Sequence, residues 1–412
     1  MKTQMRFTTP TLTAAGMVML MGTTALAEDY SDQFGTLGIA GTISELTAIE
    51  NPTPSDRFAL GGALFLRGIE TAFQERYRVG LAELDIDLPG LMTELNVNPT
   101  PEPFTPDVIA DLFAEIGSHM DQAQAAMAPI NATDQVAVTL DLGQVWFDIN
   151  ANGTREDSED LLPVMVSLFV SQRELQHTLD AINAAGGAPT ITFDTSDVAW
   201  LQAYTHVFAG TSEMVLAFDP TDIIAKVQTN VETIDTLRGG ARPRMWLSPD
   251  DENLADLITI VLGALEQDPD PEHTRAALAD FQAVIAHNVV FWDRVRAETD
   301  NNREFIPNAS QDSALGLLFP PNIDRAWQAV LTDAEQVLSG ELLIPHWRTG
   351  DQVGINLNAW LKDPAPLDVI GVLAGSDLAP YMERGPVATT RAISEFDEIT
   401  GGNFALFAFT LN

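Results

Sequence analysis

Residues 146–162, WFDINANGTREDSEDLL, place an oxygen-bearing side chain at nearly every second position around a single glycine. The residues in this alternation are Asp148, Asn150, Asn152, Gly153, Glu156 and Glu159. Calcium is a hard ion that takes about 6–8 oxygen ligands, and a short loop can surround it only if alternate side chains point inward. Gly153 permits the sharp turn that such a loop needs. The spacing therefore favours the binding of a calcium ion.

Counted from Asp148, the stretch satisfies the pattern D-x-[DN]-x-[DN]-G-x5-E at every specified position. Residues 148–159 therefore resemble an EF-hand or dockerin-type calcium loop, over 12 of the 412 residues. The resemblance implies Ca2+ as the bound ion and, as its ligands, Asp148, Asn150, Asn152, the Thr154 carbonyl, Glu156 and Glu159. Arg155 departs from the family, because a branched aliphatic residue usually stands there and joins two paired loops. We therefore expect a solitary site in which calcium is mainly structural.

The elements that must position this loop have mostly helical periodicity. Helices are predicted over 55–84, 105–127, 161–187, 195–218, 251–267, 272–299 and 321–340. Alternating apolar residues predict a strand within 135–149, which leads into the loop, and a short partner strand within 188–194. The tail 401–412 fits either a strand or a helix. The sequence thus predicts a mainly α fold, a helical bundle or irregular α-solenoid in two packed lobes, with a minor β element beside the calcium loop.

The predicted lobes meet at a break in the helical pattern. Residues 238–252 contain a Gly-Gly pair, a proline and a local basic cluster, as expected of a linker. The N-terminal lobe is then 28–237 and the C-terminal, mainly helical lobe is 253–412. The basic residues of the cluster are Arg238, Arg242 and Arg244. They are expected to clamp acidic faces across the lobe interface, with an anion or carboxylate ligand as the other interpretation.

The start of the chain resembles a bacterial secretory signal peptide over residues 1–27. Lys2 and Arg6 precede an apolar run, and Ala-Leu-Ala at 25–27 fits a cleavage site for small residues. No later segment reaches about 20 uninterrupted apolar residues, so we expect no transmembrane segment in the mature chain. The sequence therefore predicts a Sec-type exported protein that is periplasmic or secreted, with a mature chain beginning near Glu28.

Charge and cysteine content exclude several classes of protein. Without residues 1–27 the chain keeps 19 of its 21 basic residues and all 59 acidic ones, a net charge of 19 − 59 = −40. Such an acidic chain is not expected to bind nucleic acid. Cysteine is absent, which excludes disulfides, cysteine nucleophiles, thiolate zinc sites and iron–sulfur clusters.

Two classes of function stay open at this point. The first, which we favour, is an exported calcium-binding protein without catalysis, because no catalytic motif accompanies the solitary loop. The alternative is an exported hydrolase or metalloenzyme whose site combines scattered histidines and carboxylates. A gathering of His177, His206 and His287 around one cavity would favour this alternative. The sequence identifies no catalytic residue, ligand, substrate or protein partner.

Two further segments could bind ligands. Residues 298–312, ETDNNREFIPNASQD, are rich in acceptor groups, although a solvated linker fits them better than a second cation site. In the C-terminal part, four side chains within 343–361 could line a pocket for a sugar or a carboxylate, although packing at an interface is the simpler interpretation. These are His346, Trp347, Arg348 and Asp351.

Overall fold

The structure is a computed structural model. It describes residues 27–80, 97–167, 177, 179–180, 183–184, 186–239, 249–316 and 318–411. Nearly all of the predicted signal peptide lies outside these residues, as do Arg242, Arg244 and most of the predicted helix beyond residue 167.

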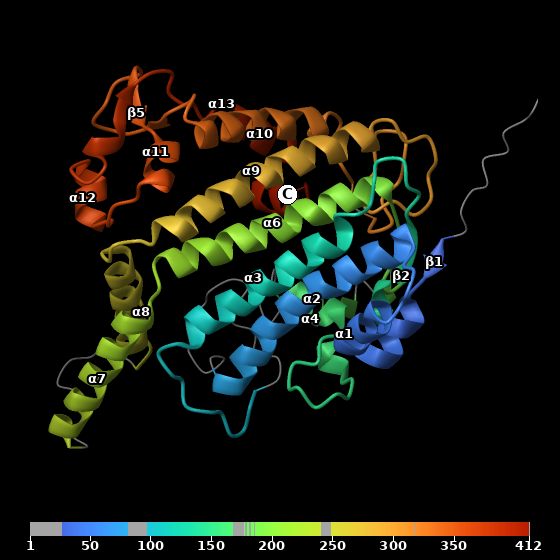
Figure 1. The fold of residues 1–412 in the computed structure, drawn as a ribbon, viewed down its shortest axis with the longest axis horizontal. Helices are drawn as coiled ribbons and strands as arrows, with labels where there is room; N and C mark the ends of the chain where they lie inside the picture. Colours follow the sequence, from blue (N-terminus) through green and yellow to red (C-terminus); the bar gives the residue numbers. More distant parts are fainter. Residues whose placement is uncertain are drawn as a thin grey trace, which may run out of the picture.

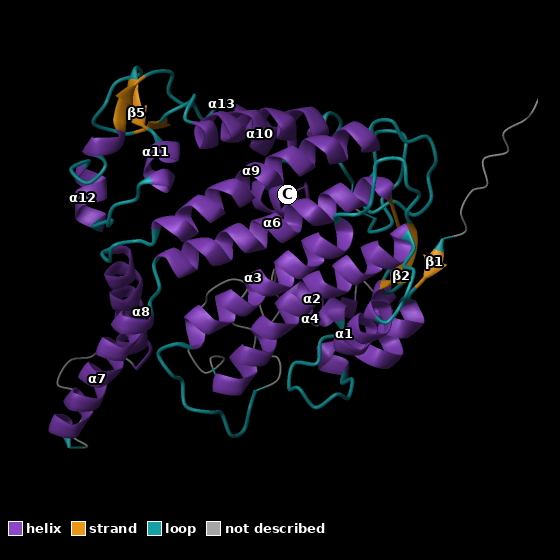
Figure 2. Ribbon diagram, in the orientation of Figure 1, coloured by secondary structure: helices purple, strands orange, loops and turns teal. Residues whose placement is uncertain are grey.

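The described residues form a mainly helical fold with two small sheets, which confirms the predicted fold class (Figure 2). The helices are α1 (Ser31–Thr47), α2 (Pro54–Val79), α3 (Val108–Met127), α4 (Leu161–Ser167), α6 (Thr195–Ala217), α7 (Thr221–Arg238), α8 (Pro249–Leu265), α9 (Pro271–Val295), α10 (Ile323–Ser339), α11 (Leu357–Lys362), α12 (Val369–Ala374), α13 (Arg391–Ile399) and α14 (Phe404–Leu411). The tail is therefore helical. Among the described helices, none combines the length and the apolar composition needed to cross a bilayer.

The long helices α2, α3, α6, α9 and α10 lie side by side and form the body of the molecule (Figure 1). Their ends follow from local residue chemistry. Thr53 and Asp56 form a capping box at the start of α2, and Gly80 ends it in the left-handed conformation. α2 therefore ends at Val79, and residues 81–84 of the predicted helix lie outside the described residues. Asp107 precedes the first residue of α3, which begins later than the sequence suggested.

The first sheet contains β1 (Glu28–Asp29), β2 (Ala137–Asp141) and β3 (Thr190–Asp194). β2 and β3 are antiparallel with Thr139 opposite Thr192, which confirms that the two predicted strands pair. β2 is shorter than predicted, because a 3-10 turn at Leu142–Gln144 follows it before the loop. A second sheet, which the sequence did not predict, contains β4 (Ile344–Pro345), β5 (Val353–Ile355) and β6 (Met382–Arg384).

Two apolar clusters form most of the core. One lies between α1, α2 and the first sheet, and the other lies among α9, α10, α13 and α14. Helices α7 and α8 form a hairpin that projects from the body (Figure 1). The predicted linker 238–252 lies between them in the sequence, and its residues 240–248 are outside the described part of the chain. Helix α6 before the hairpin packs along α9 after it. The division into two lobes at this turn stays a prediction.

Candidate functional site

The predicted calcium loop joins the segment after β2 to helix α4. Two backbone hydrogen bonds hold its flanks together: Phe147 N donates to Glu159 O over 2.8 Å, and Leu161 N donates to Val145 O over 2.9 Å. Val145 and Phe147 are completely buried. The loop therefore begins and ends at one fixed place in the core.

The backbone of the loop turns sharply at two residues. Ala151 has a φ of 56° and Gly153 a φ of 72°, both in the left-handed region. A glycine is favoured at position 153 by its left-handed backbone conformation and not by steric crowding, since no heavy atom lies within 4 Å of where a Cβ would stand. The carboxylate of Asp148 holds this turn, because its Oδ1 accepts from Asn152 N and its Oδ2 accepts from Gly153 N, both over 2.9 Å.

Side chains from four of the predicted ligand residues meet inside this turn. Asn152 N donates both to Asp148 Oδ1 and, over 3.0 Å, to Asn150 Oδ1, so these two oxygens lie close together. Glu156 Oε1 accepts from Asn150 Nδ2 over 3.1 Å and from Asn152 Nδ2 over 3.2 Å. Thr154 N donates to Asn152 Oδ1 over 2.7 Å. The alternation in the sequence therefore brings oxygen-bearing side chains together in space.

Glu159, the last predicted ligand, is completely buried. Its Oε1 accepts from Ile149 N over 3.0 Å and its Oε2 accepts from Glu156 N over 3.1 Å. Burial raises the pKa of Glu159, because the charged carboxylate loses its hydration. Arg155 does not compensate this charge, since it binds Asp160 Oδ1 over 2.7 Å and the carbonyl of Gly143 over 2.6 Å.

The donor chemistry of the loop fits a hard cation. No three His, Asp or Glu side chains in the described part of the chain are grouped as a metal site. In the loop, Asp148 and Glu159 each accept hydrogen bonds from backbone amides. A cation here would therefore depend on the asparagine oxygens as well as on the carboxylates.

Helix α2 holds the first residue of the loop. Glu70 Oε1 accepts from Asp148 N over 2.8 Å, and Gln74 Nε2 donates to Asp148 O over 2.7 Å. Glu70 is only 1% exposed and pairs with Arg67, yet burial raises its pKa. Neither Glu70 nor Gln74 was predicted from the sequence as a contact of the loop. The sequence shows a glutamate within the apolar face of a predicted helix, but this pattern does not identify the residue that the glutamate contacts.

The histidines named for the alternative function do not all gather. The rings of His206 and His287 stack with centroids 5.4 Å apart, and His206 Nδ1 lies 2.7 Å from Asp280 Oδ1. Burial lowers the pKa of His287 to about 4, and His206 adds to this effect. His177 is exposed. The structure therefore brings two of the three together, and neither lines the cavities described below.

A cluster of buried and partly buried acids joins the start of α6 to the segment 298–312. The cluster comprises Asp194, Asp197, Glu298 and Glu304, and burial raises the pKa of each of them. Asp194 and Asp197 form the capping box of α6. Glu298 accepts from the Ser196 hydroxyl and from Gln311 Nε2. These acids therefore serve local backbone and side-chain hydrogen bonds, and no second cation site is assigned to them.

Replacing Glu298 by glutamine is expected to raise the melting temperature at pH 8 and to raise it much less at pH 5. Burial raises the pKa of Glu298 to about 7, against about 4.3 in an unfolded chain. Between these values the folded state binds more protons, so stability falls as the pH rises from about 4.3 to 7. Glutamine carries no charge, so the variant does not lose this part of its stability as the pH rises.

Thermal melts of both proteins at pH 5 and pH 8, all with EGTA, measure this effect. Glu341→Gln is the control, because it removes one exposed acid that is distant in sequence from Glu298. An identical pH dependence of the melting temperature in the wild type and in Glu298→Gln would contradict the raised pKa of Glu298.

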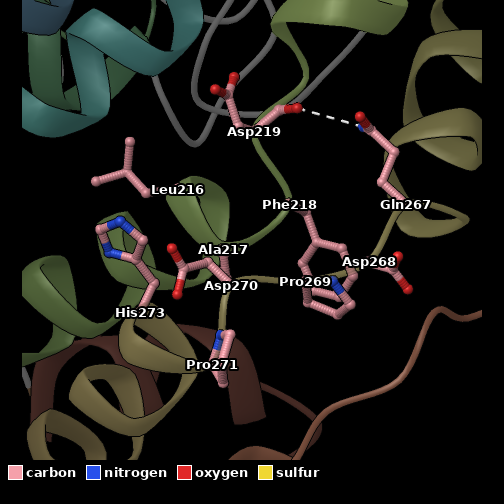
Figure 3. Close-up of a pocket in the computed structure, with 10 residues that line it drawn as sticks. All are labelled: Leu216, Ala217, Phe218, Asp219, Gln267, Asp268, Pro269, Asp270, Pro271 and His273. Atoms are coloured by element: carbon pink, nitrogen blue, oxygen red, sulfur yellow. Dashed lines mark hydrogen bonds between the residues drawn. The ribbon is translucent and has the colours of Figure 1, made fainter.

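An open pocket of about 520 Å³ lies at the base of the α7–α8 hairpin (Figure 3). The side chains of Asp219, Asp268 and Asp270 point in different directions (Figure 3). Asp270 caps α9, and His273 Nδ1 lies 2.6 Å from Glu213 Oε2. The carboxylates of this pocket therefore do not converge on one ligand.

Three of the polar-aromatic residues within 343–361 pack against one another and against α12, in line with the simpler interpretation. Trp347 is 73% exposed, its Nε1 donates to Leu373 O over 2.8 Å, and the Arg348 guanidinium lies 4.8 Å from its ring centre. His346 Nε2 lies 3.3 Å from Val372 O. Trp347 and His346 therefore contact helix α12, Arg348 packs on Trp347, and none of the three lines either described cavity.

Comparison with known proteins adds no further assignment. No protein-family model, no curated protein and no solved structure matches this chain.

Proposed function

We propose that this chain is an exported calcium-binding protein in which the solitary EF-hand-like loop holds a structural ion. The meeting of the Asp148, Asn150, Asn152 and Glu156 side chains beside the buried carboxylate of Glu159 supports the proposal most directly. A bound Ca2+ would compensate the three formal negative charges that these residues bring to one turn. The Thr154 carbonyl completes the proposed ligand set.

The surroundings of the loop favour a structural role over a sensor role. Its flanks are joined by backbone hydrogen bonds and packed into the core, so the ion would connect β2 to α4 permanently. Arg155 closes the base of the loop through Asp160 and Gly143 instead of supplying a residue for pairing with a second loop. The alternative of a hydrolase or metalloenzyme has no comparable support, because the stacked rings of His206 and His287 line neither of the two described cavities.

Calorimetric titration with CaCl2 tests the proposal. The wild type is expected to bind one ion with a dissociation constant of ~10⁻⁴–10⁻³ M, the range of extracellular modules. Glu159→Gln should weaken binding by about tenfold or more, because it removes a charged ligand that could bind through two oxygens. Asp157→Asn is the matched control: it removes the same charge from an exposed position of the loop that the motif does not use.

The comparison of the two variants decides the outcome. Asp157→Asn should stay within about threefold of the wild type, since only long-range charge is lost. Absence of calcium uptake by the wild type in 10 mM CaCl2, a concentration roughly ten or more times the expected dissociation constant, would overturn the proposal. Equal weakening in both variants would also overturn it, because that result indicates diffuse attraction to an acidic surface.

Export is the second part of the proposal and rests on the sequence of residues 1–27. Expression of the full chain in a bacterium should yield a protein in the periplasm or medium whose N-terminus, read by mass spectrometry, lies near Glu28. Full-length protein that keeps Met1 and remains in the cytoplasm would contradict this part alone.

A further inference from the structure

A partly open, apolar cavity of about 390 Å³ lies between α2, the strands β2 and β3, α4, α6 and α14. None of the described residues that line it is charged. The only ones with a polar side-chain atom are Trp200, Tyr204 and Thr410. Two of these use that atom within the protein, because Trp200 Nε1 donates to Thr410 O over 3.0 Å and Thr410 Oγ1 donates to Leu406 O over 2.8 Å. The wall is therefore almost wholly apolar.

Ordinary core packing does not leave an apolar space of this size, because cores are packed as densely as organic crystals and voids larger than a water molecule are few. Water in this space would gain few hydrogen bonds, because the described lining offers few polar partners. Atoms that face an empty space also lose dispersion contacts. The volume lies within the range of about 300–1,000 Å³ that is typical of small-molecule sites.

We propose that this cavity is a binding site for an uncharged, predominantly apolar small molecule, such as a hydrocarbon chain or a fused ring system. Phe65, Trp200 and Tyr204 supply aromatic surface on one side, with Phe65 and Trp200 each in ring contact with Tyr204. A sugar or a carboxylate would lose its hydration without gaining hydrogen bonds, so the lining selects against both.

The calcium loop supports one wall of this cavity. Val145 and Phe147, which precede the loop, and Leu161, Leu162 and Met165, which follow it, all face the cavity. The backbone bonds that join the two flanks also fix these side chains relative to one another. This coupling rests on the proposed function: a bound calcium ion would favour the apolar ligand, and the ligand would favour calcium by the same factor.

Two fluorescent probes that differ by one charge test the site. N-phenyl-1-naphthylamine is neutral, and 8-anilino-1-naphthalenesulfonate adds a sulfonate to the same ring scaffold. The neutral probe should bind the wild type with at least about tenfold higher affinity, in 0.5 M NaCl to screen the acidic surface. Failure of the neutral probe to bind, or equal affinity for both, would overturn the proposal.

A substitution at Gly62 locates the probe. A Cβ at this residue of α2 would meet only Leu201, at 3.8 Å, so a side chain can extend into the cavity without displacing backbone. Gly62→Phe should weaken binding of the neutral probe by about tenfold or more, because it fills the space the probe needs. Gly62→Ala is the matched control and should keep wild-type affinity, since it adds a single methyl group.

Tryptophan quenching decides the case in which Gly62→Phe does not fold. Trp200 lines the cavity, whereas Trp347 is 73% exposed and lies outside it. Binding of the naphthylamine should quench less tryptophan emission in Trp200→Phe than in Trp347→Phe. Equal quenching in both variants would overturn the site. Probe binding that is specific to the cavity but unaffected by calcium would leave the site intact and remove its coupling to the loop.

Discussion

Chelation of calcium is expected to lower the melting temperature of this protein by up to about 3 °C. At 10 mM CaCl2 the ion is present at about 100 times its dissociation constant if that constant lies at the tight end of the expected range, and it then stabilises the folded state by roughly 2.7 kcal/mol. In a chain of this size the entropy of unfolding is large, so that free energy corresponds to a shift on the order of 3 °C. The measurement is a thermal melt in 10 mM CaCl2 compared with one in excess EGTA.

The physical reason lies in the charges left behind. Without the ion, Asp148, Glu156 and Glu159 remain in one turn, and Glu159 has no contact with solvent. The two backbone bonds between the flanks keep this turn anchored to the core, so the carboxylates cannot separate without disturbing it. Loss of calcium should therefore destabilise the fold rather than open a groove for a partner.

Variants separate the loop from general ionic effects. Glu159→Gln should lose about half or more of the calcium shift, whereas Asp157→Asn should keep the wild-type shift. Replacement of CaCl2 by MgCl2 should give a smaller shift, because magnesium requires a tighter octahedral geometry than such a loop provides. A calcium shift that persists in full in Glu159→Gln would contradict the assignment of the loop.

Local patterns in the sequence were sufficient to predict most of the helices. The starts of α2 and α6 follow from capping residues, Thr53 with Asp56 and Asp194 with Asp197, that act within a few residues of the chain. The same is true of the loop, in which the glycine and the alternating oxygens form a local code. The pairing of β2 with β3 was also predicted, because both have strand patterns on either side of the loop.

What the sequence did not reveal depends on contacts between distant residues or on weak local preference. Helix α1 was missed because it contains Gly35, Gly38 and Gly41, and Gly38 bends it with a φ of 65° while Trp146 packs against it. Helix α7 was missed because much of its surface is polar and exposed. The cavity is formed by elements far apart in sequence, and its apolar lining has the composition of an ordinary core.

The Glu70 contact is such a long-range feature, and Glu70→Ala is expected to destabilise the protein by about 1–3 kcal/mol. Glu70 accepts the backbone N–H of Asp148 across 78 residues of sequence. Alanine offers no acceptor, and a buried N–H without a partner costs about 1–3 kcal/mol. Glu70→Gln should lose much less, because its side-chain carbonyl can still accept from Asp148.

Glu70→Ala should also weaken calcium binding, because Glu70 and Gln74 together hold the backbone N–H and C=O of Asp148, the first proposed ligand. Glu75→Ala is the control within the same helix, since Glu75 pairs with Arg78 and does not contact the loop. A double-mutant cycle between Glu70→Ala and Glu159→Gln, read by thermal melts in calcium, should give a total loss smaller than the sum of the two. Strict additivity, or equal effects of Glu70→Ala and Glu75→Ala, would show that α2 does not position the loop. The expected result is instead that a buried glutamate on one helix sets the geometry of an ion site on a distant part of the chain.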